Sequence, residues 1–365
     1  MRTLLLGMAC LTLLTAAACR GTATTKSPAA TAPQVSSAPL AADASTTDEA
    51  AAPRNTTTST SAAAVGPRLP QIARNVTAPA PVRVQAAALP PFTSARQALV
   101  LDEASAGILY AKGANVRTQP ASLTKIATAI VAIEHGNLDR VVTVDVDARN
   151  FTDSTLMGLR PGDRFSVRDL LYGLMLASGN DAAVAVGRAV SGSDAAFVAE
   201  MNQLVDRLAL QDTHFINPHG LDEPGHYTSP YDIAMIARYG MTLPDFRQIV
   251  DAQSYVANGS RTIRMDSLIS GLLRWVPGAT GVKSGYTDNA GRTLVLSADR
   301  DGRRVYSVVM NDPDREMDGA NLLEWAFANH RWQPATTPPA PAVVSAPSAP
   351  TPADADIVRA AREGR

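Results

Sequence analysis

The stretch Pro120-Ala121-Ser122-Leu123-Thr124-Lys125, followed by an apolar run to Ile133, is the part of the sequence around which the rest is organised. Pro120 suits the first position of a helix, and Gly136 suits its end. Because the run after Lys125 is apolar on almost every side, the helix is expected to be buried. Ser122 and Lys125 stand three residues apart and share a helix face. A buried hydroxyl and a buried amine are costly unless paired, which points to a Ser–Lys pair.

The backbone at Ser122 adds a second feature. The first helical turn has N–H groups without intrahelical acceptors, and it lies at the positive end of the helix dipole. A candidate nucleophile therefore stands beside a free N–H. Ser-x-x-Lys alone is more often an ordinary serine and a surface-reaching lysine, so its meaning depends on motifs elsewhere in the chain.

Charge and cysteine content exclude several classes of function. The 365 residues include 33 Lys and Arg and 34 Asp and Glu, so no basic footprint for nucleic acid is present. The two cysteines, Cys10 and Cys19, both lie near the N-terminus. The rest of the chain therefore has no disulfide, no thiol nucleophile and no thiolate metal site.

Residues 1–19 are predicted to be a secretory signal. Arg2, an apolar run from Leu4 to Leu14 and small residues before Cys19 fit such a signal, and the run is too short to span a bilayer. Cys19 also resembles the cleavage box of bacterial lipoproteins, although Ala16 stands where that box usually has leucine. Lipid attachment at Cys19 and ordinary cleavage with release both remain open. In either case the protein is expected to be extracytoplasmic, in the periplasm or at the surface of the cell envelope.

Two linkers flank the predicted domain. Residues 20–91 are mostly Ala, Thr, Ser and Pro, which bury too little apolar surface to fold, so a disordered tether is expected. Residues 333–365 form a Pro- and Ala-rich tail, whose last residues, from 353, are a frayed end or a short helix with a thin apolar face. Any contact with a membrane is expected only through an N-terminal anchor.

Residues 92–332 are long enough for one domain with a sizeable core. A hairpin is predicted at 98–112, and strands at 141–144, 280–287, 293–298 and 305–310. Capping boxes at Ser166 and Ser229, and a cap at Asp194, begin helices, and Asn258-Gly259 is a hairpin turn. A last amphipathic helix contains Leu322 to Phe327. Strands at both ends with helices between them predict an α+β fold, in which helices cover an antiparallel sheet.

Two further motifs follow the Ser122 helix. Ser178-Gly179-Asn180 stands between two predicted helices, and Lys283-Ser284-Gly285 lies on a late strand. Each is weak alone, since glycine ends helices, asparagine caps them, and surface lysines are common on strands. The ordered set Ser-x-x-Lys, Ser-x-Asn and Lys-Ser-Gly is far more specific, and it is the set found in penicillin-binding proteins and class A β-lactamases.

The domain resembles the D-alanyl-D-alanine carboxypeptidases, the low-molecular-mass penicillin-binding proteins of peptidase family S11. The resemblance covers nearly all of residues 92–332 and includes the stretches 121–126, 176–181, 215–221, 231–238 and 281–287. The sequence departs from the family where Ser284 replaces a frequent threonine and Tyr286 replaces the histidine of some members. The resemblance implies the DD-peptidase/β-lactamase-like fold.

The resemblance also implies the catalytic residues. Ser122 would attack the carbonyl of a terminal D-Ala-D-Ala bond and form an acyl-enzyme that water hydrolyses. Lys125 would be the base, because burial and the charge of Lys283 favour its neutral form. Ser178 would relay a proton to the leaving amine.

The remaining implied residues bind the substrate. Asn180 would hold the substrate amide, and Lys283 and Ser284 would face the terminal carboxylate, with Arg315 as a further contact. The N–H groups of Ser122 and Tyr286 would form the oxyanion hole. Gly285 would leave room for the substrate to lie along its strand. The implied partners are the peptidoglycan stem peptide and β-lactam antibiotics as covalent inhibitors.

Three histidines in one loop, His214, His219 and His226, raise the question of a metal. They lack the spacing of a helical zinc pair, and no cysteine is nearby, so a role in shaping the loop is favoured and no metal or other cofactor is expected.

Three other functions remain open. An endopeptidase that cuts peptide cross-links differs only in its substrate. A class A-like β-lactamase needs a glutamate for its deacylating water, and neither Glu200 nor Glu223 has the Glu-x-x-x-Asn context of that class. A non-catalytic β-lactam sensor would have no need of a Ser–Lys pair.

Overall fold

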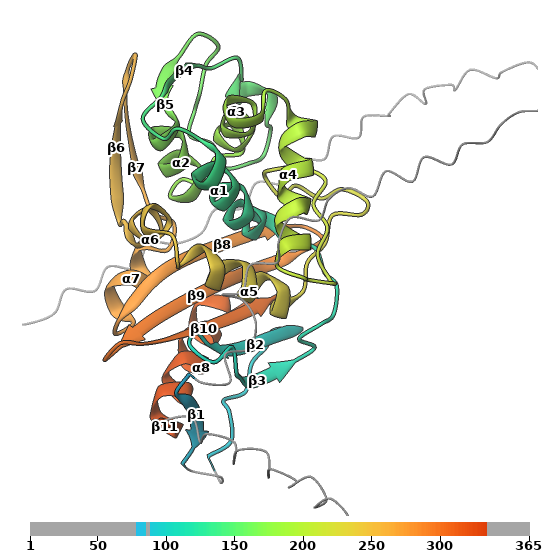
Figure 1. The fold of residues 1–365 in the computed structure, drawn as a ribbon, viewed down its shortest axis with the longest axis vertical. Coiled ribbons are helices and arrows are strands. Elements are labelled where there is room, and N and C mark those ends of the chain that lie inside the picture. Colours follow the sequence, from blue (N-terminus) through green and yellow to red (C-terminus); the bar gives the residue numbers. More distant parts are fainter. Residues whose placement is uncertain (1–77, 85–87, 334–365) are drawn as a thin grey trace, which may run out of the picture. The chain divides into compact units, whose positions relative to one another are not determined.

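The computed structural model describes residues 78–84 and 88–333. The predicted signal and Cys19, most of the predicted tether and the tail after residue 333 lie outside the described residues. The helices are η1 (Ala121–Leu123), α1 (Thr124–His135), η2 (Ala148–Asn150), α2 (Val167–Met175), α3 (Asn180–Ser191), α4 (Asp194–Arg207), α5 (Pro230–Gly240), α6 (Pro244–Asp251), α7 (Ser270–Trp275) and α8 (Arg315–Asn329) (Figure 1). The strands are β1 (Ala80–Arg83), β2 (Gln97–Asp102), β3 (Ile108–Lys112), β4 (Val141–Thr143), β5 (Arg164–Ser166), β6 (Ser254–Asn258), β7 (Thr262–Asp266), β8 (Ala279–Thr287), β9 (Gly291–Arg300), β10 (Arg303–Met310) and β11 (His330–Gln333).

A five-stranded antiparallel sheet organises the domain. Its strand order is β3-β2-β10-β9-β8, so the hairpin β2–β3 from the start of the domain pairs with the meander β8–β10 from its end. β8 forms one edge of this sheet. The motif Lys283-Ser284-Gly285 lies on β8, and its backbone therefore lies at an edge that can pair with an extended peptide.

Both faces of the sheet are covered by helices, as the alternation of side chains requires. Leu99 and Leu101 of β2 pack into the larger hydrophobic cluster with the central helices, whereas Ala98 and Val100 pack into a second cluster with α8. In Figure 1, α8 lies on one side of the sheet and α5 and α6 lie on the other. The predicted fold class, an antiparallel sheet covered by helices, is confirmed.

Helix α1 lies at the centre of the helical layer. Every residue from Thr124 to Ala132 is buried, because α1 contacts α2, α3, α4, α5 and α6. The all-round apolar pattern thus predicted burial correctly. Among the described residues no single helix is long and apolar enough to cross a membrane, and only the bent pair α3 and α4, at 87°, meets the length and composition test when taken together.

The predicted helix starts are mostly right. Ser166 and Asp169 form a complete capping box at α2. At α4 the cap is Ser193, whose side chain accepts the N–H of Ala196, so the assignment of the cap to Asp194 was wrong by one residue. Asp194 is the first helical residue, and its carboxylate pairs with Arg188 instead.

The capping box predicted at Ser229 is only half formed. The Ser229 side chain accepts the N–H of Asp232 and begins α5. The Asp232 carboxylate does not turn back to the cap, because it accepts hydrogen bonds from the Asp212 N–H at 2.7 Å and the Thr213 hydroxyl at 2.9 Å. It thereby attaches the preceding loop to the start of α5.

The folded domain begins before the predicted boundary. The tether was expected to run to Pro91, but Ala80–Arg83 form strand β1, which pairs antiparallel with His330–Gln333 of β11. The Val84 N–H also donates to the Asn329 carbonyl. Composition alone misplaced the boundary, because a short strand without a core of its own is stabilised only by its partner strand.

Candidate active site

The start of α1 brings the Ser–Lys pair together. Lys125 is fully buried, and its Nζ lies 2.9 Å from Ser122 Oγ, 2.6 Å from Asn180 Oδ1 and 2.8 Å from the carbonyl oxygen of His219. The Asn180 and His219 oxygens can only accept hydrogen bonds. A neutral amine has two N–H groups for those oxygens and one lone pair for the Ser122 hydroxyl proton. A protonated Lys125 would instead donate to all three oxygens, so these contacts fit both protonation states, and the burial of Lys125 decides between them.

The surroundings of Lys125 favour that neutral form. Burial lowers its pKa well below the ordinary lysine value, the charge of Lys283 lowers it further, and Asp181 opposes the shift. A lysine with a lowered pKa can act as a general base near neutral pH.

The turn between α2 and α3 presents the second motif. Ser178 is buried and has a positive φ of 57°, which is uncommon outside glycine. Thr155 stabilises this turn twice: its hydroxyl donates to the Ser178 carbonyl at 2.8 Å, and its carbonyl accepts the Asn180 N–H at 2.9 Å. The turn places the Ser178 hydroxyl 3.0 Å from Nζ of Lys283.

Strand β8 supplies the third motif. Lys283 donates to the Ser178 hydroxyl and, at 2.8 Å, to the carbonyl of Ser284. Burial, with a contribution from Arg315, lowers the pKa of Lys283 to about 7. Ser284 is buried beside it.

Gly285 lies where β8 meets η1. A Cβ at this position would lie 2.8 Å from the backbone nitrogen of Ser122 and 2.7 Å from the Thr293 hydroxyl. The sequence interpretation explained the absence of a side chain at Gly285 as room for the substrate. In the structure it also lets β8 approach η1 and keeps space open beside the Ser122 nitrogen.

Arg315 and Tyr286 lie at the border of the site. Arg315 donates to the Gly285 carbonyl and pairs with Glu316 at 2.8 Å, so its guanidinium is held beside β8. The Tyr286 side chain is 61% exposed, and its hydroxyl donates to Asp288. All nine residues expected at the site therefore lie together at one edge of the sheet.

All of these residues except the buried Lys125 and Lys283 line a cleft of about 840 Å³. Ser122, Ser178 and Asn180 line one part of it, and the β8 residues from Ser284 onward line another. Phe151, Leu156, Leu221 and Leu268 add apolar surface to its lining. The cleft can thus hold an extended peptide beside an edge strand, with polar groups converging on Ser122.

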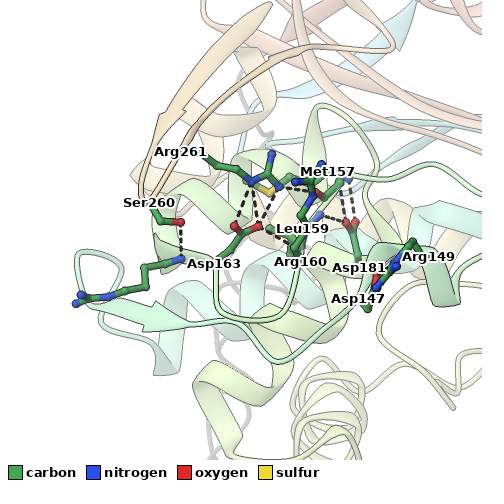
Figure 2. Close-up of polar contacts among 11 residues, drawn as sticks. Asp147, Arg149, Met157, Leu159, Arg160, Asp163, Asp181, Ser260 and Arg261 are labelled. Atoms are coloured by element: carbon green, nitrogen blue, oxygen red, sulfur yellow. Dashed lines mark hydrogen bonds and ion pairs between the residues drawn. The ribbon is translucent and has the colours of Figure 1, made fainter.

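The wall of the cleft that carries Thr155 depends on Asp181, which sequence reasoning missed. Its fully buried carboxylate accepts the N–H groups of Met157, Gly158 and Leu159 at 2.8–2.9 Å, as well as that of Ala182 (Figure 2). The only available signal was an aspartate directly after Asn180 in the first turn of a helix.

The Asp181 carboxylate thus clamps this loop to α3, and a second clamp, the Asp163–Arg261 pair, holds the same loop. Arg261, from the turn between β6 and β7, pairs with Asp163 at 2.9 Å and donates to the Gly158 carbonyl. Figure 2 shows both clamps on residues 157–163. The loop is fixed at one end by α3 and at the other by the β6–β7 hairpin.

The three histidines do not converge. His219 lines the cleft, and its Nδ1 accepts the Leu221 N–H, whereas His214 is exposed and His226 is buried away from the cleft lining. Within residues 78–84 and 88–333 no group of three or more histidine, cysteine or acidic side chains is placed to hold a metal ion.

Comparison with known proteins places this geometry in context. A family model described as D-alanyl-D-alanine carboxypeptidase, peptidase family S11, matches residues 84–314. The chain is 38% identical over 256 residues to the D-alanyl-D-alanine carboxypeptidase DacD of Salmonella typhimurium, covering 66% of this chain and 64% of that protein. It is 34% identical over 238 residues to DacB2 of Mycobacterium tuberculosis, covering 63% of this chain and 81% of that protein. The chain therefore spans less than two thirds of the length of some of these relatives.

Solved structures agree with these matches. A serine-to-alanine mutant of the Streptomyces K15 DD-transpeptidase superposes with a TM-score of 0.62 at 32% identity, covering 65% of this chain and 99% of that chain. Penicillin-binding protein 6B of Escherichia coli superposes with a TM-score of 0.61 at 37% identity, covering 65% of this chain and 78% of that one.

Proposed function

Because the chain belongs to the D-alanyl-D-alanine carboxypeptidase family, peptidase family S11, we propose that it is a serine-type carboxypeptidase that removes the terminal D-alanine of peptidoglycan stem pentapeptides. The observation that carries this proposal is the fully buried amine of Lys125, 2.9 Å from the Ser122 hydroxyl and otherwise surrounded by oxygens that only accept hydrogen bonds. A pair of this kind serves to activate a nucleophile.

Acylation begins when the substrate carbonyl lies beside Ser122. The Ser122 proton moves to Nζ of Lys125 as the bond from Oγ to the carbonyl carbon forms. The negative charge of the tetrahedral intermediate falls on the former carbonyl oxygen, where the N–H groups of Ser122 and Tyr286 donate to it. The leaving D-alanine amine takes the hydroxyl proton of Ser178, which is held beside Lys283. The proton that Lys125 took from Ser122 replaces it, so Lys125 is neutral again before deacylation. The C–N bond then breaks, leaving an ester on Ser122.

Deacylation restores the enzyme. Water attacks the ester carbonyl and its proton goes to Lys125. The Ser122–carbonyl bond then breaks, and Lys125 returns the proton to Ser122 Oγ as the shortened peptide is released. The same N–H groups stabilise this second intermediate.

Substrate orientation follows from charge and from the strand edge. The stem peptide lies along β8, and Asn180 holds its amide. Its terminal carboxylate faces Lys283, Ser284 and Arg315, of which Arg315 and protonated Lys283 carry positive charge. β-Lactam antibiotics present a carboxylate and a reactive amide in similar positions, so they are proposed to acylate Ser122.

The test is release of D-alanine from a muropeptide pentapeptide, with Ser122→Ala as the control. Free D-alanine from the wild type but not from the control supports the proposal. Cleavage of a cross-linked dimer without D-alanine release would indicate the endopeptidase instead. Rapid turnover of penicillin without a lasting adduct would indicate a β-lactamase, and a lasting adduct with no peptide cleavage would indicate a sensor.

A DD-transpeptidase is a second candidate, because the K15 DD-transpeptidase superposes over 99% of its own chain. Both activities form the same acyl-enzyme and differ in whether water or an amine attacks it. Adding an amine acceptor such as glycylglycine to the pentapeptide assay separates them, since transpeptidation gives a new peptide bond in place of hydrolysis.

The location is also a proposal. Substrate of this kind lies outside the cytoplasm, which agrees with the N-terminal signal predicted from the sequence. Growth with a labelled fatty acid tests anchoring at Cys19: label in the wild type but not in Cys19→Ser supports a lipid anchor, and no label in either indicates release.

A further inference from the structure

His226 is buried in the loop that joins α4 to α5, yet its two ring nitrogens have definite partners. Nδ1 lies 3.0 Å from the backbone nitrogen of Ile216, and Nε2 lies 2.8 Å from the hydroxyl of Thr124. The side chain is 2% exposed and does not line the cleft. It therefore contacts the first residue of α1 from behind the candidate active site.

The directions of these hydrogen bonds can be assigned by donor and acceptor. The Ile216 N–H can only donate, so Nδ1 of His226 accepts and the ring proton lies on Nε2. Nε2–H then donates to the Thr124 hydroxyl, whose own proton donates to the Ala121 carbonyl at 2.9 Å. Burial, aided by His214, lowers the pKa of His226 to about 4, so the neutral ring that this chain of bonds requires is maintained.

The Ala121 carbonyl at the end of this chain is under unusual constraint. Ala121 has a positive φ of 51°, a conformation that persists in a non-glycine residue only where its surroundings enforce it. A Cβ on Gly220 would lie 1.9 Å from the Ala121 oxygen, so backbone packs directly against the carbonyl. The carbonyl is thus held between Gly220 and Thr124, which donates to it from its backbone N–H as well as from its hydroxyl.

The same peptide unit carries the N–H of Ser122. In a planar trans peptide the carbonyl and the N–H point in opposite directions, so fixing the Ala121 oxygen also fixes the direction of the Ser122 N–H. The space beside the Ser122 nitrogen is the space that Gly285 leaves open. The orientation of this peptide consequently sets where an oxyanion would be bound.

We propose that His226 is a positioning residue that, through Thr124 and the Ala121 carbonyl, aims the Ser122 N–H at the oxyanion of the acyl-transfer intermediate. The inference rests on the proposed acyl transfer at Ser122. It assigns a catalytic consequence to a histidine that does not touch the substrate.

The experiment measures acylation by a fluorescent penicillin and separates the limiting acylation rate from the apparent dissociation constant. The variants are His226→Ala, Thr124→Val, the double variant, and the conservative changes His226→Gln and Thr124→Ser. Active-site titration and thermal melting determine the folded fraction of each. His214→Ala is the matched control, because His214 is on the same loop but exposed, and burial is the larger cause of the lowered pKa of His226.

His226→Ala and Thr124→Val are expected to slow the limiting rate by about 10- to 100-fold, as a misdirected catalytic group does, with little change in the dissociation constant. The double variant should lose no more than the worse single variant, because both break one chain of contacts. His226→Gln keeps a donor for the Thr124 hydroxyl, and Thr124→Ser keeps a hydroxyl donor for the Ala121 carbonyl, so both variants should retain most of the limiting rate. His214→Ala should behave as wild type.

Normal limiting rates in folded His226→Ala or Thr124→Val would overturn the inference, as would losses that multiply in the double variant. Thr124→Val is nearly isosteric, so it decides the matter if His226→Ala does not fold. If the wild type itself is not acylated at Ser122, the proposed function fails. If the wild type and every variant are acylated at the normal rate, only the positioning role of His226 is overturned.

Discussion

Lys125 and Lys283 are two buried amines in one site with different partners. Lys125 contacts the Ser122 hydroxyl and two carbonyl-type oxygens, which suits a neutral base. Lys283 contacts a hydroxyl and one carbonyl and lies near Arg315, where a substrate carboxylate would add the missing negative charge. Burial lowers the pKa of both amines, but the proposed reaction requires Lys125 to lose its proton and Lys283 to keep its proton.

Lys125→Arg is expected to reduce acylation by about 100-fold or more, because a buried guanidinium stays charged and cannot take the Ser122 proton. In the wild type the acylation rate should rise with pH, since the neutral fraction of Lys125 increases as pH passes through its lowered pKa. The measurement is the limiting acylation rate at saturating fluorescent penicillin across pH, which leaves out the binding step that the charge of Lys283 affects, with thermal melting as the check on folding. A near-normal rate in Lys125→Arg would exclude Lys125 as the base.

Lys283→Arg, unlike Lys125→Arg, is expected to preserve the function of the residue, because that function is a positive charge. In the free wild-type enzyme the pKa of Lys283 is about 7, so its charge is present below that pH and is lost as pH rises through it. Carboxylate binding in kcat/KM should weaken accordingly, whereas arginine stays charged. The ratio of kcat/KM of the variant to that of the wild type should therefore rise as pH increases through 7. A flat ratio would show that the charge of Lys283 does not bind the substrate.

At the scale of elements, the loop between η2 and β5 determines the shape of the Ser178 turn. Thr155 holds the turn, and Asp181 and the Asp163–Arg261 pair hold the loop. The loop lacks regular structure, so its backbone N–H groups need side-chain acceptors, and the two oxygens of the Asp181 carboxylate accept three of them.

Asp181→Asn is expected to lower the free energy of unfolding by about 2–3 kcal/mol, because an amide offers one acceptor oxygen and turns an NH₂ group toward backbone donors. Acylation should slow as well, since Thr155 would no longer be fixed against Ser178. Urea unfolding and the fluorescent penicillin assay measure the two effects.

Asp147→Asn is the matched control for Asp181→Asn. Its carboxylate is near the same loop and is 16% exposed, but it accepts only one backbone N–H, that of Arg149, and its ion-pair partner Arg149 is exposed. Stability should therefore fall much less than in Asp181→Asn, and acylation should stay nearly unchanged. Equal effects of the two changes would contradict the role of Asp181 in fixing the loop between η2 and β5.

How much of the site the sequence predicts depends on the range of the contacts. Ser122 and Lys125 are neighbours on one helix, and the other two motifs have fixed local spacing, so their residues were recognisable. Thr155, Asp181 and His226 act through partners 22 to 102 residues away, which no local pattern encodes. The same limit explains the misassigned half of the Ser229 capping box, where a tertiary partner replaced the local one.

At the scale of the molecule, the active site forms where two distant segments meet the edge strand β8. η1 supplies Ser122, the α2–α3 turn supplies Ser178, and β8 itself supplies Lys283, and the sheet that aligns them pairs strands from both ends of the domain. The alternating and all-round apolar patterns were sufficient to predict helices on a sheet. The pairing of β1 with β11 was not predictable, because neither short strand has a pattern that distinguishes it from a linker.

This pairing gives the last prediction, which concerns where the domain begins. Deleting residues 1–77 should leave stability unchanged, whereas deleting residues 1–91 also removes β1 and the Trp325 contact to the Ala88 carbonyl. Four cross-strand pairs of half-exposed residues contribute about 1–3 kcal/mol together, and each kcal/mol lowers the melting temperature of a domain of this size by about 2–4 °C. Thermal melting of the two truncated proteins measures the difference. Equal melting temperatures would mean that β1 contributes nothing and that the domain begins after Pro91. Acylation of Ser122 should persist in both proteins, since β1 and β11 form a separate two-stranded sheet outside the one that carries β8.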